Sequence, residues 1–129
     1  MTLSIDELRA LATVSDAVTQ ECGCAIASLH GWTRTPIDFP QEQMRNAGTL
    51  VVDPYAEPTY AEYHPHGSNY WSPEAPIAPQ YFPYNRCTAQ QCTVCGRCCL
   101  AYVEGGGYYV EPRVRALDPR RIVDVPASH

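Results

Sequence analysis

Lysine is absent from this chain of 129 residues, so all nine of its basic side chains are arginines. Fourteen acidic residues outnumber them and give a formal net charge of −5 at pH 7. A general nucleic-acid binder is expected to carry a basic stripe. The missing lysines therefore argue against nucleic acid as a partner, although six of the nine arginines lie in residues 86–129.

Long apolar runs are missing as well. The chain has no stretch of about 18 apolar residues, the length that a membrane-spanning helix requires. Its first ten residues, MTLSIDELRA, are polar where a secretory signal would be apolar. We therefore expect no membrane contact and a cytoplasmic location. In that reducing compartment the seven cysteines favour metal binding over disulfide formation.

Motifs for catalysis are also lacking. No HExxH or HxE motif accompanies the histidines, so the sequence offers no general base for a catalytic zinc. A thiol oxidoreductase places its CxxC pair at the start of a helix, whereas the residues that follow Cys95 have the character of a strand. The sequence does not require an enzyme, and we expect none.

Cysteine is abundant in the second half of the chain. Five of the seven cysteines fall within thirteen residues, at Cys87, Cys92, Cys95, Cys98 and Cys99. The two residues between Cys92 and Cys95 allow a tight turn whose backbone amides point at sulfur. Gly96 follows, and glycine permits the left-handed backbone that closes such a turn. This zinc-knuckle pattern supplies half of a tetrahedral metal site.

The other half of the site has several candidates. Cys87 is close enough in sequence to fold back over the knuckle, and a neutral imidazole is a common zinc ligand. His64 is favoured over His66 because the proline after it holds the backbone of His64 extended. The expected ligands of a Zn²⁺ ion are therefore Cys87, Cys92, Cys95 and His64, with His66 or Cys98 as the alternative fourth ligand.

The roles of the other four cysteines are left open. Cys98 would complete an all-thiolate site, but neighbouring side chains of a strand point to opposite faces, so Cys99 would then point away from the metal. Cys22 and Cys24 form either a second half-site, a redox pair, or two buried apolar side chains. An iron–sulfur cluster is the alternative to zinc, since the spacing from Cys87 to Cys95 matches the first three ligands of plant-type ferredoxins.

The run Cys92-x2-Cys95-Gly96-x-Cys98-Cys99 resembles the CxxCxxCC signature of a family of proteins described as zinc- or iron-chelating. The resemblance covers eight residues and implies a metal role for its four cysteines. A knuckle that leads into a hairpin is also similar to zinc ribbons, which normally carry a second CxxC pair.

The N-terminal residues predict a helix over residues 3–21. Ser4 and Glu7 have the spacing of a capping box, and Gly23 is suited to the left-handed cap that ends a helix. Leu3 is placed to pack on Leu8 at the start of that helix.

The middle of the chain predicts a strand over 25–29, a short helix over 40–47 and a strand over 49–52. Residues 53–85 contain seven prolines and six tyrosines, and we name them the Pro/Tyr segment. Prolines stiffen a chain and aromatic rings pack well, so this segment is expected to form an ordered coil around the domain.

The C-terminal part predicts a metal knuckle and a β-hairpin over residues 86–117, with strands on either side of the glycines at 105–107. The expected fold is a small zinc-stabilised α+β domain spanning 1–129, with an N-terminal helix, a long Pro/Tyr-rich coil and a zinc-ribbon-like hairpin.

An acidic chain with a rigid, tyrosine-rich surface and no catalytic motif indicates a protein that works by binding another protein, as an inhibitor, an adaptor or an immunity-type antidote. Its partner would present a basic face. The alternatives are a metal-handling or redox protein that uses the cysteines directly, and a zinc-ribbon nucleic-acid binder.

Overall fold

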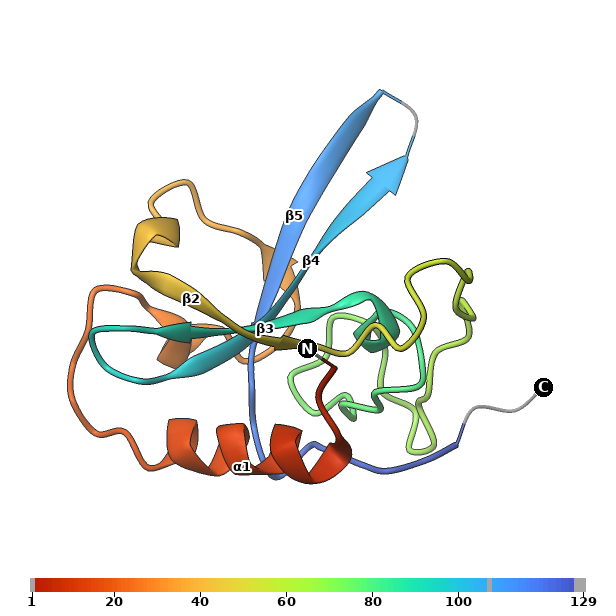
Figure 1. The fold of residues 1–129 in the computed structure, drawn as a ribbon, viewed down its shortest axis with the longest axis horizontal. Coiled ribbons are helices and arrows are strands. Elements are labelled where there is room, and N and C mark those ends of the chain that lie inside the picture. The colour runs from red at the N-terminus through yellow and green to blue at the C-terminus, as the bar shows by residue number, and fades with distance from the viewer. Residues whose placement is uncertain (1, 107, 127–129) are drawn as a thin grey trace.

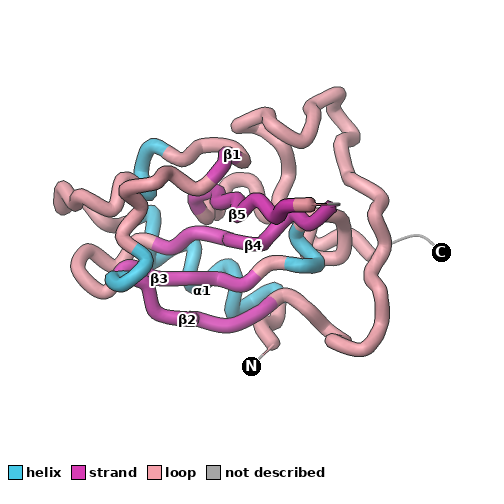
Figure 2. The backbone as a smooth tube through the Cα atoms, turned by 90° about the horizontal axis from the view of Figure 1, so that it is seen from above, coloured by secondary structure: helices cyan, strands magenta, loops and turns pink. Residues whose placement is uncertain are grey.

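The computed structural model describes residues 2–106 and 108–126. Within them, one α-helix packs against a five-stranded antiparallel sheet with the strand order β1-β5-β4-β3-β2 (Figures 1 and 2). The strands are β1 (Thr33–Arg34), β2 (Met44–Thr49), β3 (Thr88–Cys92), β4 (Cys98–Gly106) and β5 (Tyr109–Ala116). The expected α+β class is confirmed.

Helix α1 (Ile5–Asp16) begins at the predicted capping box. The backbone N–H of Glu7 donates to Ser4 Oγ at 3.1 Å, and the backbone N–H of Ser4 donates to Glu7 Oε1 at 2.9 Å. Leu8 is fully buried in one cluster with Leu3 and with Leu100 of β4. The helix therefore covers one face of the sheet, as Figure 1 shows below the strands.

The helix ends at Asp16, several residues before the predicted end near residue 21. Side-chain contacts to the turn between β3 and β4 explain the difference. Ser15 Oγ accepts the N–H of Cys98 at 2.8 Å, and the Arg97 guanidinium donates to the carbonyls of Gln20 at 2.7 Å and Val18 at 3.4 Å. These contacts hold residues 17–20 against the sheet, so the helix does not continue to Gly23.

Three other predicted elements differ from the structure. Residues 40–47 form the 3-10 helix η2 (Gln41–Gln43) and then enter β2, because pairing with β3 overrides their modest helix propensity. The strand predicted over 49–52 has only its first residue within β2. Residues 25–29 contain the 3-10 helix η1 (Ile26–Ser28) in place of a strand, since Ala25 takes a left-handed conformation with φ of 62°.

Strands β4 and β5 form the predicted hairpin, paired from Cys99 with Ala116 to Gly106 with Tyr109. Gly107, part of the expected glycine turn, lies outside the described residues. The far half of the hairpin projects beyond the other strands (Figure 1).

The Pro/Tyr segment packs beside the sheet and is joined to it by a buried arginine (Figure 1, yellow to green). Arg115 of β5 is fully buried and donates to the carbonyls of Pro73 at 3.0 Å and Ala75 at 2.8 Å, and to the hydroxyl of Tyr84 at 2.5 Å. Since a buried polar group is costly unless it is hydrogen-bonded, these contacts fix the segment in one position.

Among the described residues, no helix combines the length and the apolar character needed to cross a membrane.

Candidate metal centre

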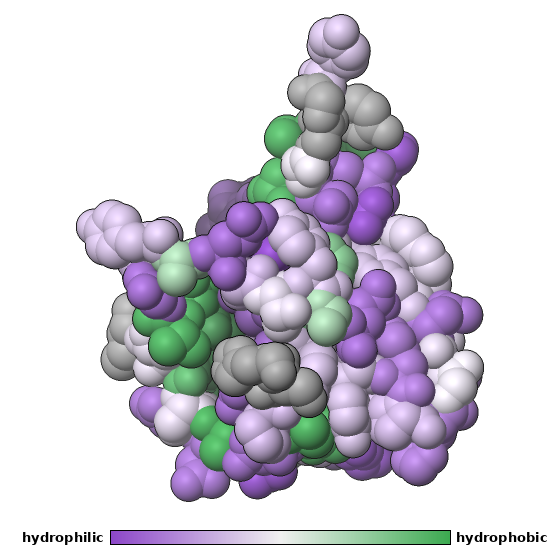
Figure 3. All heavy atoms as spheres, turned by 90° about the vertical axis from the view of Figure 1, so that its right-hand side faces the viewer, coloured by the Kyte–Doolittle hydropathy of each residue, from purple (hydrophilic) through white to green (hydrophobic). Residues whose placement is uncertain are grey.

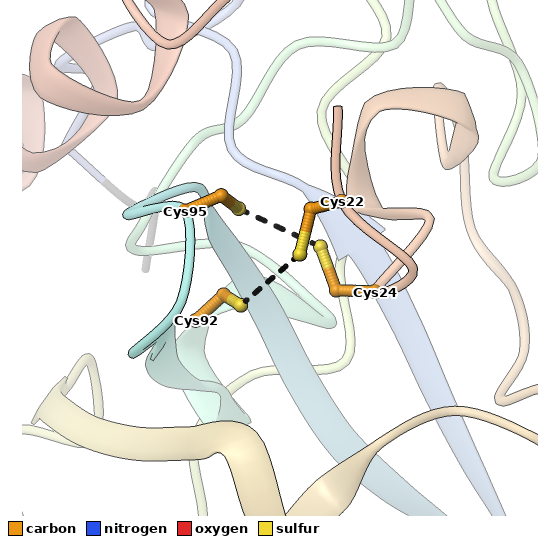
Figure 4. Close-up of side chains that lie close together, drawn as sticks. All are labelled: Cys22, Cys24, Cys92 and Cys95. Atoms are coloured by element: carbon orange, nitrogen blue, oxygen red, sulfur yellow. Dashed lines mark hydrogen bonds between the residues drawn. The ribbon is translucent and has the colours of Figure 1, made fainter. Parts of the chain in front are cut away.

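Four cysteines from two distant segments converge at one end of the sheet. Cys22 and Cys24 lie in the loop between α1 and η1, whereas Cys92 ends β3 and Cys95 lies in the turn between β3 and β4. Figure 4 shows their side chains pointing toward one another. All four sulfur atoms lie within 4.8 Å of one another. We refer to these four residues as the thiol cluster.

The sulfur positions fit a tetrahedral metal site. A zinc–sulfur bond of about 2.3 Å places the sulfurs of an ideal tetrahedron about 3.8 Å apart. Cys22 Sγ lies 3.8 Å from Cys92 Sγ, and Cys24 Sγ lies 3.7 Å from Cys95 Sγ. The donor set is uniform and soft, which suits a metal ion that prefers thiolates. These four cysteines could therefore hold one metal ion.

The turn between β3 and β4 has the predicted knuckle geometry. The N–H of Gly96 donates to the carbonyl of Cys92 at 2.9 Å, and Gly96 has a φ of 91°. The N–H of Arg97 points at Cys95 Sγ at 3.5 Å. The left-handed glycine and the amide directed at sulfur are both confirmed.

The loop that carries Cys22 and Cys24 is held on both sides. Before it, the Arg97 guanidinium binds the carbonyls of Val18 and Gln20. After it, the N–H of Ala116 donates to the carbonyl of Leu29 at 2.8 Å. Because Arg97 belongs to the knuckle turn, the same residue joins the two halves of the thiol cluster.

Cys92 and Cys24 differ in how readily their thiols lose a proton. Burial alone would raise the pKa of Cys92, but hydrogen bonds from the backbone of Cys95 and Val94 and from neighbouring thiols lower that pKa to about 7. Burial raises the pKa of Cys24 to about 12, and its hydrogen bonds to the thiols of Cys22 and Cys95 add to the rise. A bound cation would stabilise all four thiolates, so metal binding is coupled to proton release.

Of the ligands expected from the sequence, the structure brings together Cys92 and Cys95 but leaves the other two elsewhere. Cys87 is fully buried in the core, where its Sγ lies 3.2 Å from the carbonyl of Pro83 as a hydrogen-bond donor. His64 has both ring nitrogens engaged, with Ser68 Oγ and Glu62 Oε1 each at 2.8 Å. The cysteines that lie beside Cys92 and Cys95 are Cys22 and Cys24.

The alternative ligands also lie outside the thiol cluster. His66 is exposed in the Pro/Tyr segment. Cys98 is buried in the cluster that contains Leu8, and Cys99 in the one that contains Cys24, so the two neighbours face opposite sides of the sheet as predicted. Burial raises the pKa of Cys98 to about 11 and that of Cys99 to about 12, which keeps both as thiols.

The sequence does contain the signal for the second half of the site. Each half of the thiol cluster is a closely spaced pair, with one residue between Cys22 and Cys24 and two residues between Cys92 and Cys95. Two such pairs supply four ligands, whereas the CxxCxxCC run contributes only Cys92 and Cys95 to the cluster. Sequence distance favoured Cys87, although closeness in sequence does not determine contact in a folded sheet.

Comparison with protein-family models, with curated proteins and with solved structures finds no match to this chain. The resemblance to zinc- or iron-chelating proteins is therefore confined to the CxxCxxCC run. Only Cys92 and Cys95 of that run belong to the thiol cluster.

Proposed function

We propose that this chain binds one zinc ion through Cys22, Cys24, Cys92 and Cys95, and that the ion stabilises a small zinc-ribbon-like domain. The observation that supports the proposal is the convergence of four sulfurs from two segments. Tetrahedral sites made only of thiolates are typical of zinc or of iron bound to sulfur.

A structural role follows from the ligand count. Structural zinc sites have four protein ligands, whereas catalytic sites keep one position for water or substrate. Here four cysteines would fill all four positions. The ion would join the loop after α1 to the knuckle turn, so that the helix and the hairpin are held as one domain.

Cobalt substitution and elemental analysis test the metal proposal. We expect about one zinc per chain after purification under reducing conditions, and strong visible absorption after exchange for Co²⁺, because four thiolates bind cobalt tetrahedrally. The weak absorption of octahedral cobalt, or a protein without bound zinc, would contradict the proposal. A brown protein that contains iron and sulfide would favour the iron–sulfur alternative.

We further propose that the stabilised domain acts by binding another protein, as inhibitors, adaptors and immunity-type antidotes do. The support is the projecting hairpin. Residues 101, 103 and 105 of β4 share one face with residues 110, 112 and 114 of β5, because side chains alternate along a strand and the register pairs these positions. All six residues on this face are apolar or glycine.

The outer part of this hairpin face is uncovered. Val103 is 58% exposed and Val110 is 65% exposed, while Val114 near the thiol cluster is buried. Figure 3 shows hydrophobic surface along the projecting hairpin. Exposed apolar patches of this kind mark interaction sites more often than single apolar side chains do.

Variants of the hairpin face test the binding proposal. Val103→Asp with Val110→Asp should abolish recovery of a stoichiometric partner from native lysate, while the matched change of exposed Val52 to Asp should leave it intact. Equal recovery of the partner by the two variants would exclude the hairpin face as its binding site. If no partner is recovered and the metal exchanges freely with Cu(I), a metal-handling function would be favoured.

A further inference from the structure

All four sulfurs of the thiol cluster are close to one another, and two of the contacts are short sulfur pairs that each join the two halves of the cluster. One pair is Cys22 with Cys92, at 3.8 Å, and the other is Cys24 with Cys95, at 3.7 Å. In each pair one side chain is partly exposed and the other is buried: Cys22 and Cys95 are partly exposed, whereas Cys24 and Cys92 are each 1% exposed. Every accessible sulfur therefore has a protected partner.

Solvent reaches Cys22 through an open hollow on the surface. The hollow is lined by Glu21, Cys22, Gly23, Ala27 and Arg97. A small oxidant can therefore approach Cys22, whose sulfur lies 3.8 Å from the sulfur of the buried Cys92. The remaining cysteines, Cys87, Cys98 and Cys99, are fully buried and lie outside the cluster.

We infer that the thiol cluster is a redox-sensitive site at which hydrogen peroxide replaces the bound zinc with two specific disulfides, Cys22–Cys92 and Cys24–Cys95. The inference rests on the proposed zinc function. The oxidant is a peroxide from outside the protein, and oxidation begins at the accessible sulfur of each pair.

The chemistry balances for each pair. The Cys22 thiolate attacks one oxygen of hydrogen peroxide, the O–O bond breaks, and hydroxide departs as the leaving group. The product is a sulfenic acid on Cys22. The Cys92 thiolate then attacks that sulfur, the S–S bond forms, and a second hydroxide leaves. Cys95 and Cys24 react in the same way with a second peroxide.

In total, four thiolates lose four electrons and two peroxides gain them, with four hydroxides as the other product. The zinc ion keeps its charge throughout and leaves because it has lost all of its ligands. Each sulfur pair must close from its present separation to about 2.0 Å. Cys22, Cys24 and Cys95 lie in loops or turns, where the backbone can adjust more easily than within a strand.

Oxidation and chelation then have different consequences for the fold. Chelation leaves four free thiols and releases the loop after α1 from the knuckle turn. Oxidation removes the same ion but joins the same two segments covalently, and a disulfide between distant segments stabilises a fold by restricting the unfolded chain. The oxidised protein should therefore remain folded without metal.

The experiment treats zinc-loaded protein with two equivalents of hydrogen peroxide and follows three quantities. We expect one zinc per chain to be released to a chromogenic chelator. Free thiols counted under denaturing conditions should fall from seven to three, because four of the seven cysteines form the thiol cluster. Tryptic digestion should yield a cross-linked species of residues 10–34 and 87–97, which contain the two halves of the cluster.

Two double variants, compared in the reduced metal-free state, resolve the pairing. Cys24→Ser with Cys95→Ser keeps the first pair and should still form a Cys22–Cys92 disulfide. Cys24→Ser with Cys92→Ser keeps Cys22 and Cys95, which belong to different pairs, and should form its disulfide more slowly.

Disulfides within one segment, sulfinic acids, or equal rates for the two double variants would overturn the inference. Absence of zinc before oxidation would contradict the proposed function alone. In that case the two double variants, which are compared without metal, still decide whether the pairing is right.

Discussion

Cys24 and Cys95 place their sulfur atoms 3.7 Å apart although 71 residues separate them in the chain. Neither residue reaches this position through local structure alone. The contact requires α1 to dock on the sheet, Arg97 to hold the carbonyls after the helix, and Leu29 to pair with Ala116. The thiol cluster is therefore a product of the tertiary fold, and a metal bound there would in turn stabilise that fold.

Removal of zinc should destabilise the protein strongly. Structural zinc contributes about 10–16 kcal/mol to the folding of small zinc-finger peptides. This chain has a sheet core of its own, so we expect a smaller loss and a melting temperature lower by at least about 10 °C. Thermal unfolding followed by circular dichroism, with and without a zinc chelator under reducing conditions, measures the change. Identical melting curves would show that the ion has no structural role.

Arg97→Ala should weaken zinc binding even though Arg97 offers no ligand atom. The guanidinium positions the loop that carries Cys22 and Cys24. Loss of a residue that orients metal ligands typically lowers metal affinity about 10- to 100-fold. Competition with a chromophoric chelator gives the affinity.

The matched control for that variant is Arg120→Ala. Arg120 is a largely exposed arginine that forms ion pairs with Asp16 and Asp118. Equal zinc affinities of the two variants would mean that the guanidinium of Arg97 does not position the site.

Arg115→Ala should destabilise the fold without affecting the metal directly. The substitution leaves the carbonyls of Pro73 and Ala75 without their donor and opens a cavity beside Tyr84. We expect a loss of about 3–5 kcal/mol in the free energy of unfolding, with zinc stoichiometry unchanged in the folded fraction. Denaturant titration gives the free energy, and a loss below about 1 kcal/mol would show that the buried arginine is not what fixes the Pro/Tyr segment.

Local patterns in the sequence predicted local structure well. The capping box at Ser4, the knuckle closed by Gly96 and the β4–β5 hairpin depend on residues that are neighbours in the chain, and all three are present. The helix predicted over 40–47 failed because its propensity is weak and pairing with β3 decides its conformation. The end of α1 was misplaced because Arg97, far along the chain, holds the residues that follow it.

The same contrast between local and distant contacts holds for the candidate metal site. Cys92 and Cys95 were predicted to lie together because a CxxC-Gly pattern is typical of a tight turn, and the structure has that turn. Cys22 and Cys24 were considered but not preferred, because their approach depends on how the helix docks. His64 was preferred for its ligand chemistry, yet it bonds to two neighbours in its own loop, Glu62 and Ser68.

Zinc stoichiometry of three matched variants tests the central claim most directly. Native mass spectrometry of Cys24→Ser, Cys87→Ala and His64→Ala, each expressed with zinc, reports the number of ions per chain. We predict that Cys24→Ser loses the ion, whereas Cys87→Ala and His64→Ala each retain one. Retention of zinc by Cys24→Ser together with its loss from Cys87→Ala or His64→Ala would contradict the account.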